Sequence, residues 1–430
     1  MARPNIILIV ADTLRKDYSQ DLDKLLSLGF VKYNAFSTSP WTLPSHVSMF
    51  TGLFPSQHGV HEDFDVSDEV GGYDSLARQA MERFDNLISL LRDEGYRTIG
   101  ASANGFASPL YGFDFDETYI IPLPPIFVLD SEKYKFLFFK SRSKLRIAFE
   151  MIKAGKIWEL IKIGTSYFQY HYLSRITHKG CNLILDTLKK LNLSEPFFLF
   201  VNEMEAHEPY SRDMLGFIGD FSKIEYFVIK SVLYGTADEY VIRHYRRYYP
   251  IHADNSTRCV INILSELSKY VESDNTLIIV TSDHGQHIGE QGRIGHGYYL
   301  SDELVNVPLY IKYPKDTPSG TKIKQQDVSL TAIFFLIKSI VYGDKLVLGD
   351  SIFSESYGIN YSVKVLKSMF SADEKVLKRI YRHKIRISYG DRYAIFDVNK
   401  DEIVETKGQI DRESVRDKVK NWLASIKLEA

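Results

Sequence analysis

Three apolar, β-branched segments recur along the chain, and each is followed directly by polar side chains. They are NIILIVAD (residues 5–12), PFFLFVNE (196–203) and NTLIIVTSD (275–283). Continuous apolar runs of this kind are typical of strands that are buried on both faces of a parallel sheet. Segments with helical patterns separate them, including a long one at about 240–270. The alternation therefore predicts an α/β fold with a central, mostly parallel sheet flanked by helices.

Shorter segments fit the same scheme. DLDKLLSLGF (21–30) predicts a helix that Gly29 closes, and SHVSMFTG (45–52) predicts one that stops at Gly52, with Ser45 or the preceding loop as its cap. LISLLRDEGYRTIGASAN (87–104) predicts a helix, a turn and a strand, and VPLYIKYP (307–314) a further short strand. These segments add strands and covering helices to the predicted sheet.

The 430 residues allow more than one domain. We expect a catalytic domain over residues 1–325 and a smaller C-terminal α+β subdomain over 326–430, where short strands and helices alternate. Residues 130–180 are rich in Lys, Arg and aromatic residues. This segment is either a set of solvated helix faces or an insertion that acts as a lid over an anionic substrate or contacts an acidic lipid surface.

Charge and cysteine content narrow the class of protein. The formal net charge of −2 shows no electrostatic footprint for a nucleic-acid partner. The two cysteines, Cys181 and Cys259, lie in helical patterns without metal-site or disulfide-framework spacing, so we expect them to be core positions. The N-terminal apolar run fits a buried strand better than a signal peptide, and later runs are too short to span a bilayer. The sequence predicts a cytoplasmic protein.

Polar residues gather where the predicted strands end. In open α/β sheets, ligands bind at the carboxyl ends of the strands. We therefore expect one site to contain the residues at or just past these ends, namely Asp12, Asn104, Glu203, Glu205, His207, Asp283 and His284.

A metal and a hydroxyl nucleophile would suit this position. Adjacent Asp283 and His284 offer carboxylate oxygen and imidazole nitrogen to a divalent cation, and Asp12 offers a second carboxylate. Thr42, in SPWTLPSHVSMFTG (39–52), is a weak nucleophile by itself, but coordination to the metal would favour its alkoxide. Pro44 stiffens the turn, and the following helix N-terminus favours an oxyanion. The natural target is a phosphate or sulfate ester.

Four ordered motifs resemble the sulfatase family of the alkaline phosphatase superfamily. They are RPNIILIVADTLRKD, WTLPSHVSMFTGLFPSQHGV, EAHEPY and TSDHGQHIGEQGRIGHGYYLSDELVNVPLYIKYP, and together they cover roughly residues 3–315. The resemblance implies an alkaline phosphatase/sulfatase-like sheet, a bound divalent cation and a covalent sulfo- or phospho-enzyme intermediate.

The resemblance also implies roles for individual residues. Asp12, Asp283 and His284 match metal ligands, and Thr42 matches the nucleophile, which also contacts the metal. His207 matches the histidine of a His-x-Pro motif, and His296 lies where relatives assist the leaving group. Asn104 resembles a substrate-binding donor of phosphate-cleaving relatives, and His46, at the position of a signature arginine, is assigned to substrate binding with it.

Departures from the family pattern bear on the substrate. Typical sulfatases carry Cys or Ser, converted to formylglycine, where this chain has Thr42. IGASANGF (99–106) lacks the lysine and histidine of the second sulfatase signature, and Thr13 replaces a second aspartate. The pattern resembles instead the threonine-nucleophile phosphodiesterases, phosphonate monoester hydrolases and phosphoglycerol-type transferases of the same superfamily.

We therefore predict a metal-dependent hydrolase of sulfate or phosphate esters that acts through a covalent Thr42 intermediate. Phosphodiesters or phosphonate esters are favoured over aryl sulfates, and the substrate is a small-molecule, glycan or lipid ester. The imidazole favours Mn, Zn or Ca over Mg, and Glu203 or Glu205 could bind a second metal. Two alternatives stay open: a phosphoglycerol- or phosphoethanolamine-type transferase to a sugar or lipid hydroxyl, and a non-catalytic binding protein that retains the fold.

Overall fold

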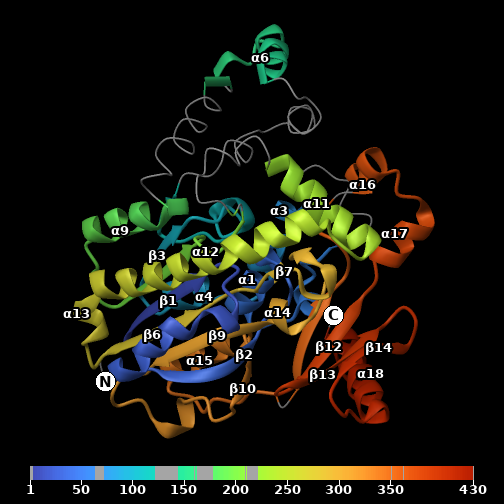
Figure 1. Cartoon of the computed structure of the whole chain (residues 1–430). Helices are drawn as coiled ribbons and strands as arrows, with labels where there is room; N and C mark the ends of the chain where they lie inside the picture. Colours follow the sequence, from blue (N-terminus) through green and yellow to red (C-terminus); the bar gives the residue numbers. More distant parts are fainter. Residues whose placement is uncertain are drawn as a thin grey trace.

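An eight-stranded sheet forms the centre of the molecule (Figure 1). The computed structural model describes residues 3–62, 72–121, 144–158, 160–161, 178–208, 210, 221–349, 351–361 and 363–429. The strand order is β10-β2-β9-β6-β1-β5-β3-β4, and among these strands β9 alone runs antiparallel to its neighbours. The bounds are β1 Asn5–Ala11, β2 Val31–Phe36, β3 Arg97–Ser102, β4 Glu117–Ile120, β5 Phe197–Glu203, β6 Thr276–Thr281, β9 Asn306–Lys312 and β10 Asp327–Ser329.

Strand β1 shows why the sheet is covered on both faces. All seven of its residues are buried, and successive side chains point to opposite faces of the sheet. Ile6, Leu8 and Val10 join one apolar core, and Ile7, Ile9 and Ala11 join the other. The first core contains helices α1 (Thr42–Thr51), α3 (Gly72–Arg83), α4 (Leu87–Asp93) and α15 (Ala332–Tyr342), and the second contains α9 (Cys181–Lys190) and α12 (Glu239–Glu266). The predicted α/β architecture is confirmed.

Two predicted helix ends are confirmed, and of the two predicted caps of α1 the preceding loop is correct and Ser45 is not. Gly29 (φ 85°) ends the 3-10 helix η2 (Gln20–Leu28), and Gly52 (φ 73°) ends α1. A Cβ at Gly52 would lie 2.7 Å from the ring of Phe334, which leaves room for glycine alone. However, α1 begins at Thr42, three residues earlier than Ser45, and the Ser45 hydroxyl donates to the Asp283 carbonyl instead of capping the helix.

A second, antiparallel sheet lies in the C-terminal part of the chain. Its order is β11-β12-β13-β14, and α18 packs against it through Val415 and Val419. Strand β10 and helix α15 belong to the large sheet and its covering layer, so we propose that the smaller subdomain begins after α15 rather than at residue 326. The bounds are β11 Ile352–Ser356, α16 Val363–Phe370, α17 Glu374–Ile380, β12 Lys384–Tyr389, β13 Arg392–Asp397, β14 Glu402–Lys407 and α18 Arg412–Glu429.

Short elements complete the described part of the chain. They are η1 Lys16–Tyr18, α2 Pro55–His58, η4 Pro109–Tyr111, α6 Lys144–Lys153, η7 His178–Gly180, α11 Phe221–Tyr234, α13 Ser268–Val271, β7 His287–Ile288, η8 Glu290–Gly292, β8 Ile294–Gly295, α14 Asp302–Val305 and η9 Ser319–Thr321. Of the basic segment 130–180, residues 130–143, 159 and 162–177 lie outside the described residues. No helix in the described part of the chain is long and apolar enough to cross a membrane.

Cys181 and Cys259 form a disulfide that joins the start of α9 to α12. Both residues are buried, as expected of core positions, but they also form a disulfide, which their spacing gave no reason to expect. They are 78 residues apart in the sequence, and only the packing of the two helices on the same sheet face brings their Cα atoms to 5.9 Å. Sequence spacing therefore carried no sign of the pair.

Candidate functional site

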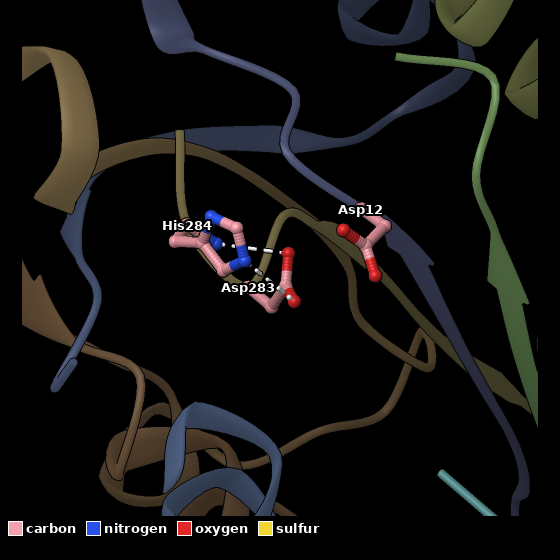
Figure 2. Close-up of side chains that lie close together, drawn as sticks. All are labelled: Asp12, Asp283 and His284. Carbon is pink, nitrogen blue, oxygen red and sulfur yellow. Dashed lines mark hydrogen bonds and ion pairs between the residues drawn. The ribbon is translucent and has the colours of Figure 1, made fainter. Parts of the chain in front are cut away.

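The carboxyl ends of β1 and β6 place three ligand-type side chains together (Figure 2). Asp12 follows β1, and Asp283 and His284 follow β6, which pairs with β1 in parallel. All three residues are fully buried, and one oxygen or nitrogen atom of each lies within 4.8 Å of those of the others. Adjacent parallel strands thus bring the predicted metal ligands to one point.

Each of the two carboxylates has one oxygen that accepts no hydrogen bond within the described part of the chain. Asp283 Oδ1 accepts from the backbone N–H groups of Thr13 (3.1 Å) and His284 (2.9 Å), and Asp12 Oδ2 accepts from Asn104 Nδ2 (2.6 Å). Asp283 Oδ2 and Asp12 Oδ1 are buried and have no hydrogen-bond partner among the described residues. A buried acceptor without a partner is costly. These two oxygens therefore fit coordination to a cation.

The third ligand is oriented in the same way. His284 Nδ1 donates to the Gly285 carbonyl (2.9 Å), so the lone pair of Nε2 remains available. Two carboxylate oxygens and one imidazole nitrogen form a donor set that suits a divalent cation. Burial, and to a lesser extent the negative charge of Asp283, raises the pKa of Asp12 well above its usual range. A bound cation would offset both effects.

Two backbone positions hold the ligand loops in place. Thr13 has a φ of 59°, which is unusual for a β-branched residue, and in this conformation its N–H reaches Asp283. A Cβ at Gly285 would lie 2.0 Å from the Glu303 carbonyl oxygen, so the turn after His284 requires glycine. The sequence pattern Asp-His-Gly therefore has a steric reason here.

Thr42 faces the ligand cluster from the first turn of α1. It is 3% exposed, and its Oγ1 lies 3.3 Å from His284 Nε2. The Ser45 hydroxyl donates to the Asp283 carbonyl at 2.8 Å, which ties the same helical turn to the ligand loop. The hydroxyl that the sequence singled out is thus held beside the candidate metal ligands.

His46 lies one turn further along α1, behind Thr42. Its Nδ1 donates to the Thr42 carbonyl (2.9 Å), and its Nε2 accepts from Asn202 Nδ2 (3.2 Å). Burial lowers the pKa of His46, so its ring is neutral. Because both ring nitrogens already bind protein groups, neither is directed at a substrate. We replace the expected substrate-binding role of His46 with the proposal that it positions Thr42.

His207 and His296 form a second layer over the cluster. Their ring centres are 5.1 Å apart, and the His296 ring centre lies 4.5 Å from that of His284. His207 Nδ1 donates to the Glu208 carbonyl (2.8 Å), and His296 Nδ1 donates to Gln286 Oε1 (2.7 Å). Burial lowers the pKa of His207 to about 4 and that of His296 well below its usual value. Both rings are neutral, with the lone pair on Nε2.

Two further residues at the site, Lys179 and Glu208, carried little sequence signal. Lys179 Nζ donates to the carbonyls of Glu205 (3.1 Å) and His207, and burial lowers its pKa to about 8. Glu208 accepts from the Gln286 side chain, and burial raises its pKa to about 7. Glu208 follows the motif histidine directly, which could have drawn attention to it. Lys179 belongs to the basic segment, and its neighbours in sequence give no reason to place it here.

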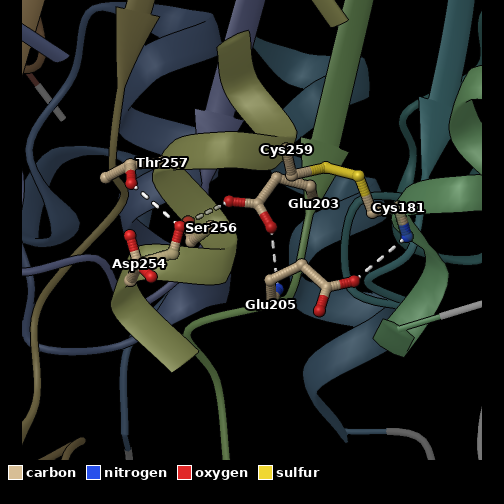
Figure 3. The surroundings of a disulfide bond; sticks show 7 residues. All are labelled: Cys181, Glu203, Glu205, Asp254, Ser256, Thr257 and Cys259. Atoms are coloured by element: carbon tan, nitrogen blue, oxygen red, sulfur yellow. Dashed lines mark hydrogen bonds between the residues drawn. A yellow bond between two sulfur atoms is a disulfide. The ribbon is translucent and has the colours of Figure 1, made fainter. Parts of the chain in front are cut away.

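The carboxylates of Glu203 and Glu205 do not join the metal cluster (Figure 3). Glu203 accepts from the Ser256 hydroxyl and from the Glu205 N–H (2.7 Å), and Glu205 accepts from the Cys181 N–H (3.2 Å). Within the described ranges, Asp12, Asp283 and His284 are the single group of three or more side chains arranged for a metal ion. The arrangement therefore supports one metal. Glu205 instead binds the first residue of α9, and Glu203 binds Ser256 within α12.

Comparisons with known proteins agree with this site and fold. The family model described as Sulfatase matches residues 4–341. The uncharacterized sulfatase YidJ of Escherichia coli (strain K12) is 24% identical over 358 residues, which are 74% of this chain and 65% of that protein. The chain thus spans slightly less than two thirds of that relative's length.

Solved structures share the fold at low identity. The phosphonate monoester hydrolase of Agrobacterium radiobacter superimposes with a TM-score of 0.59 at 16% identity, covering 99% of this chain and 96% of that one. A 2-O GAG sulfatase gives a TM-score of 0.54 at 14% identity, covering 99% and 91%. The family match extends over most of the chain and includes every strand of the large sheet. This chain belongs to the sulfatase family.

Proposed function

We propose that the chain is a metal-dependent hydrolase of sulfate or phosphate esters, that phosphodiesters or phosphonate esters are its preferred substrates, and that Thr42 is its nucleophile. The observation that carries the proposal is the position of Thr42 Oγ1, 3.3 Å from His284 Nε2 and beside two buried carboxylates with unpaired oxygens. The phosphonate monoester hydrolase with the same fold supports the preference for phosphorus. A glycan ester is a further candidate, because a 2-O GAG sulfatase also shares the fold.

Asp12, Asp283 and His284 would hold the cation. A bound divalent ion supplies two effects: it lowers the pKa of a neighbouring hydroxyl and offsets the negative charge of the ester. The imidazole among the ligands favours Zn or Mn over Mg, and the two carboxylates are also compatible with Ca. Asn104 fixes the orientation of Asp12 through one amide hydrogen, in addition to any donation to the substrate.

The protein's own groups carry the bond changes. Thr42 Oγ1 loses its proton to water and bonds to phosphorus or sulfur, while the bond to the leaving oxygen breaks. The leaving oxygen takes a proton from His296 or His207. Although both rings are neutral in the free protein, a bound anionic ester would stabilise the protonated form of either ring. In the second step, a water molecule gives one proton to the same histidine, and the oxygen of that water bonds to phosphorus or sulfur. The bond to Thr42 Oγ1 breaks, and Thr42 takes a proton from another water molecule. The same histidine thus acts first as acid and then as base.

Initial rates test this proposal. Metal-stripped protein is refilled with Mn, Zn, Ca or Mg and assayed on an aryl sulfate, an aryl phosphate, a bis-aryl phosphate and an aryl phosphonate. We expect metal-dependent cleavage that is fastest on the diester or phosphonate and falls at least about a thousand-fold in Thr42→Ala. Thr51→Ala, at the far end of the same helix, is the matched control and should keep its rate.

Other results select the alternatives. Dominant sulfate cleavage would contradict the preference for phosphorus, and transfer to an added sugar or lipid hydroxyl in place of water would show a transferase. A protein that binds no divalent ion and cleaves none of these esters would be the non-catalytic binding protein that retains the fold. Full activity of Thr42→Ala would refute the assigned nucleophile.

The cellular location is a separate proposal. The sequence predicts the cytoplasm, whereas disulfides are typical of oxidising compartments and of the cytosol of hyperthermophiles. We propose a compartment, or an organism, in which the Cys181–Cys259 pair stays oxidised. Blocking free thiols at the moment of cell lysis and measuring the mass of the protein tests this. An unblocked pair supports the proposal, and a doubly blocked protein contradicts it.

A further inference from the structure

Large apolar side chains are exposed along α6 and the residues that follow it. We call them the 149–161 face; its members are Phe149 (55% exposed), Ile152 (51%), Ile157 (52%), Trp158 (78%) and Ile161 (47%). In α6, Ala148, Phe149 and Ile152 lie at the spacing of one helical stripe. Large apolar side chains exposed this closely along one segment indicate a site of interaction, because exposing them to water is unfavourable.

The segment around this face is strongly basic. Residues 130–180 contain eleven Lys and Arg against four Asp and Glu, although the whole chain has a net charge of −2. Among the described residues, one of these cations lies against the face: Lys153 Nζ is 4.7 Å from the centre of the Phe149 ring. Lysine can lay its alkyl chain along apolar surface and keep its charge in water. An exposed apolar stripe with interspersed cations is the pattern of a helix that lies in a membrane interface.

The position of the segment in the fold favours a large flat partner. Figure 1 shows α6 projecting from the body on the side away from the C-terminal sheet. Ile121 and Gly180, which lie before and after the segment that contains α6, are neighbours next to the candidate site. A Cβ at Gly180 would lie 2.9 Å from Ile121 and 3.1 Å from Ala103, which precedes Asn104. The segment that carries the 149–161 face thus leaves and rejoins the body of the molecule close to the residue that precedes Asn104.

We propose that the 149–161 face binds the surface of a bilayer that contains anionic phospholipids. The apolar side chains enter the interface, Trp158 lies at the level of the head groups, and the exposed Lys153 attracts the negative surface. The net positive charge distinguishes this partner from a second copy of the chain, because two basic segments repel each other. The binding is peripheral, since α6 is too short to span a bilayer.

Vesicle cosedimentation of the full chain tests the proposal. We expect strong binding to phosphatidylcholine vesicles that also contain phosphatidylglycerol, and weak binding to phosphatidylcholine alone. Trp158→Ser should weaken the partition about ten-fold, and its matched control is Val347→Ser, an apolar residue of similar exposure (73%) elsewhere. Lys153→Glu should weaken it at least about five-fold, and Lys345→Glu, also exposed, should not. Thermal unfolding checks that all variants fold.

Several outcomes would overturn the proposal. They are equal binding to both vesicle types, no binding to either, and equal loss in Val347→Ser and Trp158→Ser. Sedimentation equilibrium without vesicles adds another: self-association that Trp158→Ser abolishes would show that a second copy covers the face. The experiment needs neither metal nor substrate, so its result is independent of the proposed catalytic activity.

Discussion

At the scale of single residues, the site depends on hydrogen bonds that leave particular lone pairs free. Asn104 and the N–H groups of Thr13 and His284 occupy one oxygen of each ligand aspartate, and the other oxygen remains for a cation. Partners of metal ligands orient them and typically contribute about 10- to 100-fold to metal affinity or activity. The candidate metal site therefore includes these supporting groups as well as the three side chains that could bind the cation.

Asn104→Ala tests this support. Because Asp12 loses the donor that fixes its orientation, we expect the Mn2+ affinity of metal-stripped protein to fall about 10- to 100-fold in calorimetric titration. Asp274→Asn, an exposed aspartate paired with Lys315, should bind Mn2+ like the wild type. Unchanged affinity in Asn104→Ala would show that the Asn104–Asp12 bond does not support metal binding.

His46 can be tested by substitutions that preserve different parts of its ring. Asn can replace the Nδ1–H that donates to the Thr42 carbonyl, whereas Leu cannot. We expect kcat to fall strongly in His46→Leu and less in His46→Asn, with Mn2+ affinity close to wild type in both. If KM rose in both variants and kcat did not change, His46 would be a substrate-binding residue, as the sequence suggested.

The residue-scale prediction from sequence succeeded where strand ends decided the position. Asp12, Asp283 and His284 follow buried strands that pair in parallel, so a sheet necessarily brings them together. Lys179 could not be found in this way. Lys179 lies at the end of the basic segment 130–180. Its contacts with the carbonyls of Glu205 and His207 depend on tertiary structure, which local sequence patterns do not predict.

At the scale of secondary structure elements, the disulfide connects two helices next to the site. Figure 3 shows Cys181 and Cys259 beside Glu203 and Glu205, the carboxylates at the end of β5. Lys179 precedes Cys181 by two residues, so the covalent link also limits the movement of the segment that carries this lysine. The cross-link therefore stabilises one edge of the candidate site.

Cys259→Ser, made together with Cys181→Ser, measures this contribution. Removing a cross-link between residues 78 apart should lower the free energy of unfolding by about 2–4 kcal/mol, because the unfolded chain gains freedom. Urea unfolding of both proteins measures the difference. A reducing agent should destabilise the wild type and leave the double variant unchanged. A wild type that is insensitive to reduction would contradict the expectation.

Helix α1 shows what sequence patterns do and do not predict at this scale. Its end at Gly52 was predicted, because a left-handed residue is needed there. Its start was left open between Ser45 and the preceding loop, because serine is a common cap and the pattern around Thr42 and Pro44 is also typical of a helix start; the helix begins at Thr42. This start matters for function, since Thr42 is itself part of the first turn.

At the scale of the whole molecule, buried carboxyl groups lie between the large sheet and the C-terminal sheet. Glu355, on β11, accepts from the N–H (2.7 Å) and the hydroxyl (2.8 Å) of Ser56, next to α1. It is 1% exposed, and burial raises its pKa to about 8. The folded protein thus holds Glu355 protonated at a pH at which the unfolded chain has already lost the proton.

This shift gives a sign for the effect of pH on stability. A carboxyl whose folded pKa is raised stabilises the fold fully below its unfolded pKa, and this contribution is lost as the pH rises toward about 8. The stability of Glu355→Gln, relative to the wild type, should therefore increase from pH 5 to pH 8. Thermal unfolding across this range measures it, with Glu402→Gln, which is exposed, as the control. A constant difference between variant and wild type would contradict the shift.

The large sheet could be predicted from sequence because its central strands are continuous apolar runs with polar ends. The limits of the smaller subdomain were harder to predict. Strand β10 is short, and its pairing with β2 depends on a contact between residues about 290 positions apart. Patterns along the chain describe local periodicity, and they do not encode which distant strand a short segment joins.

The most direct test of the central claim is the site of the covalent intermediate. Metal-loaded protein turning over a saturating aryl phosphonate or bis-aryl phosphate is quenched in acid, digested and analysed by peptide mass spectrometry. We predict the phosphorus group on Thr42, in the peptide that contains the first turn of α1. The group on another residue, or an unmodified Thr42 while the aryl alcohol is released in a burst, would contradict the account.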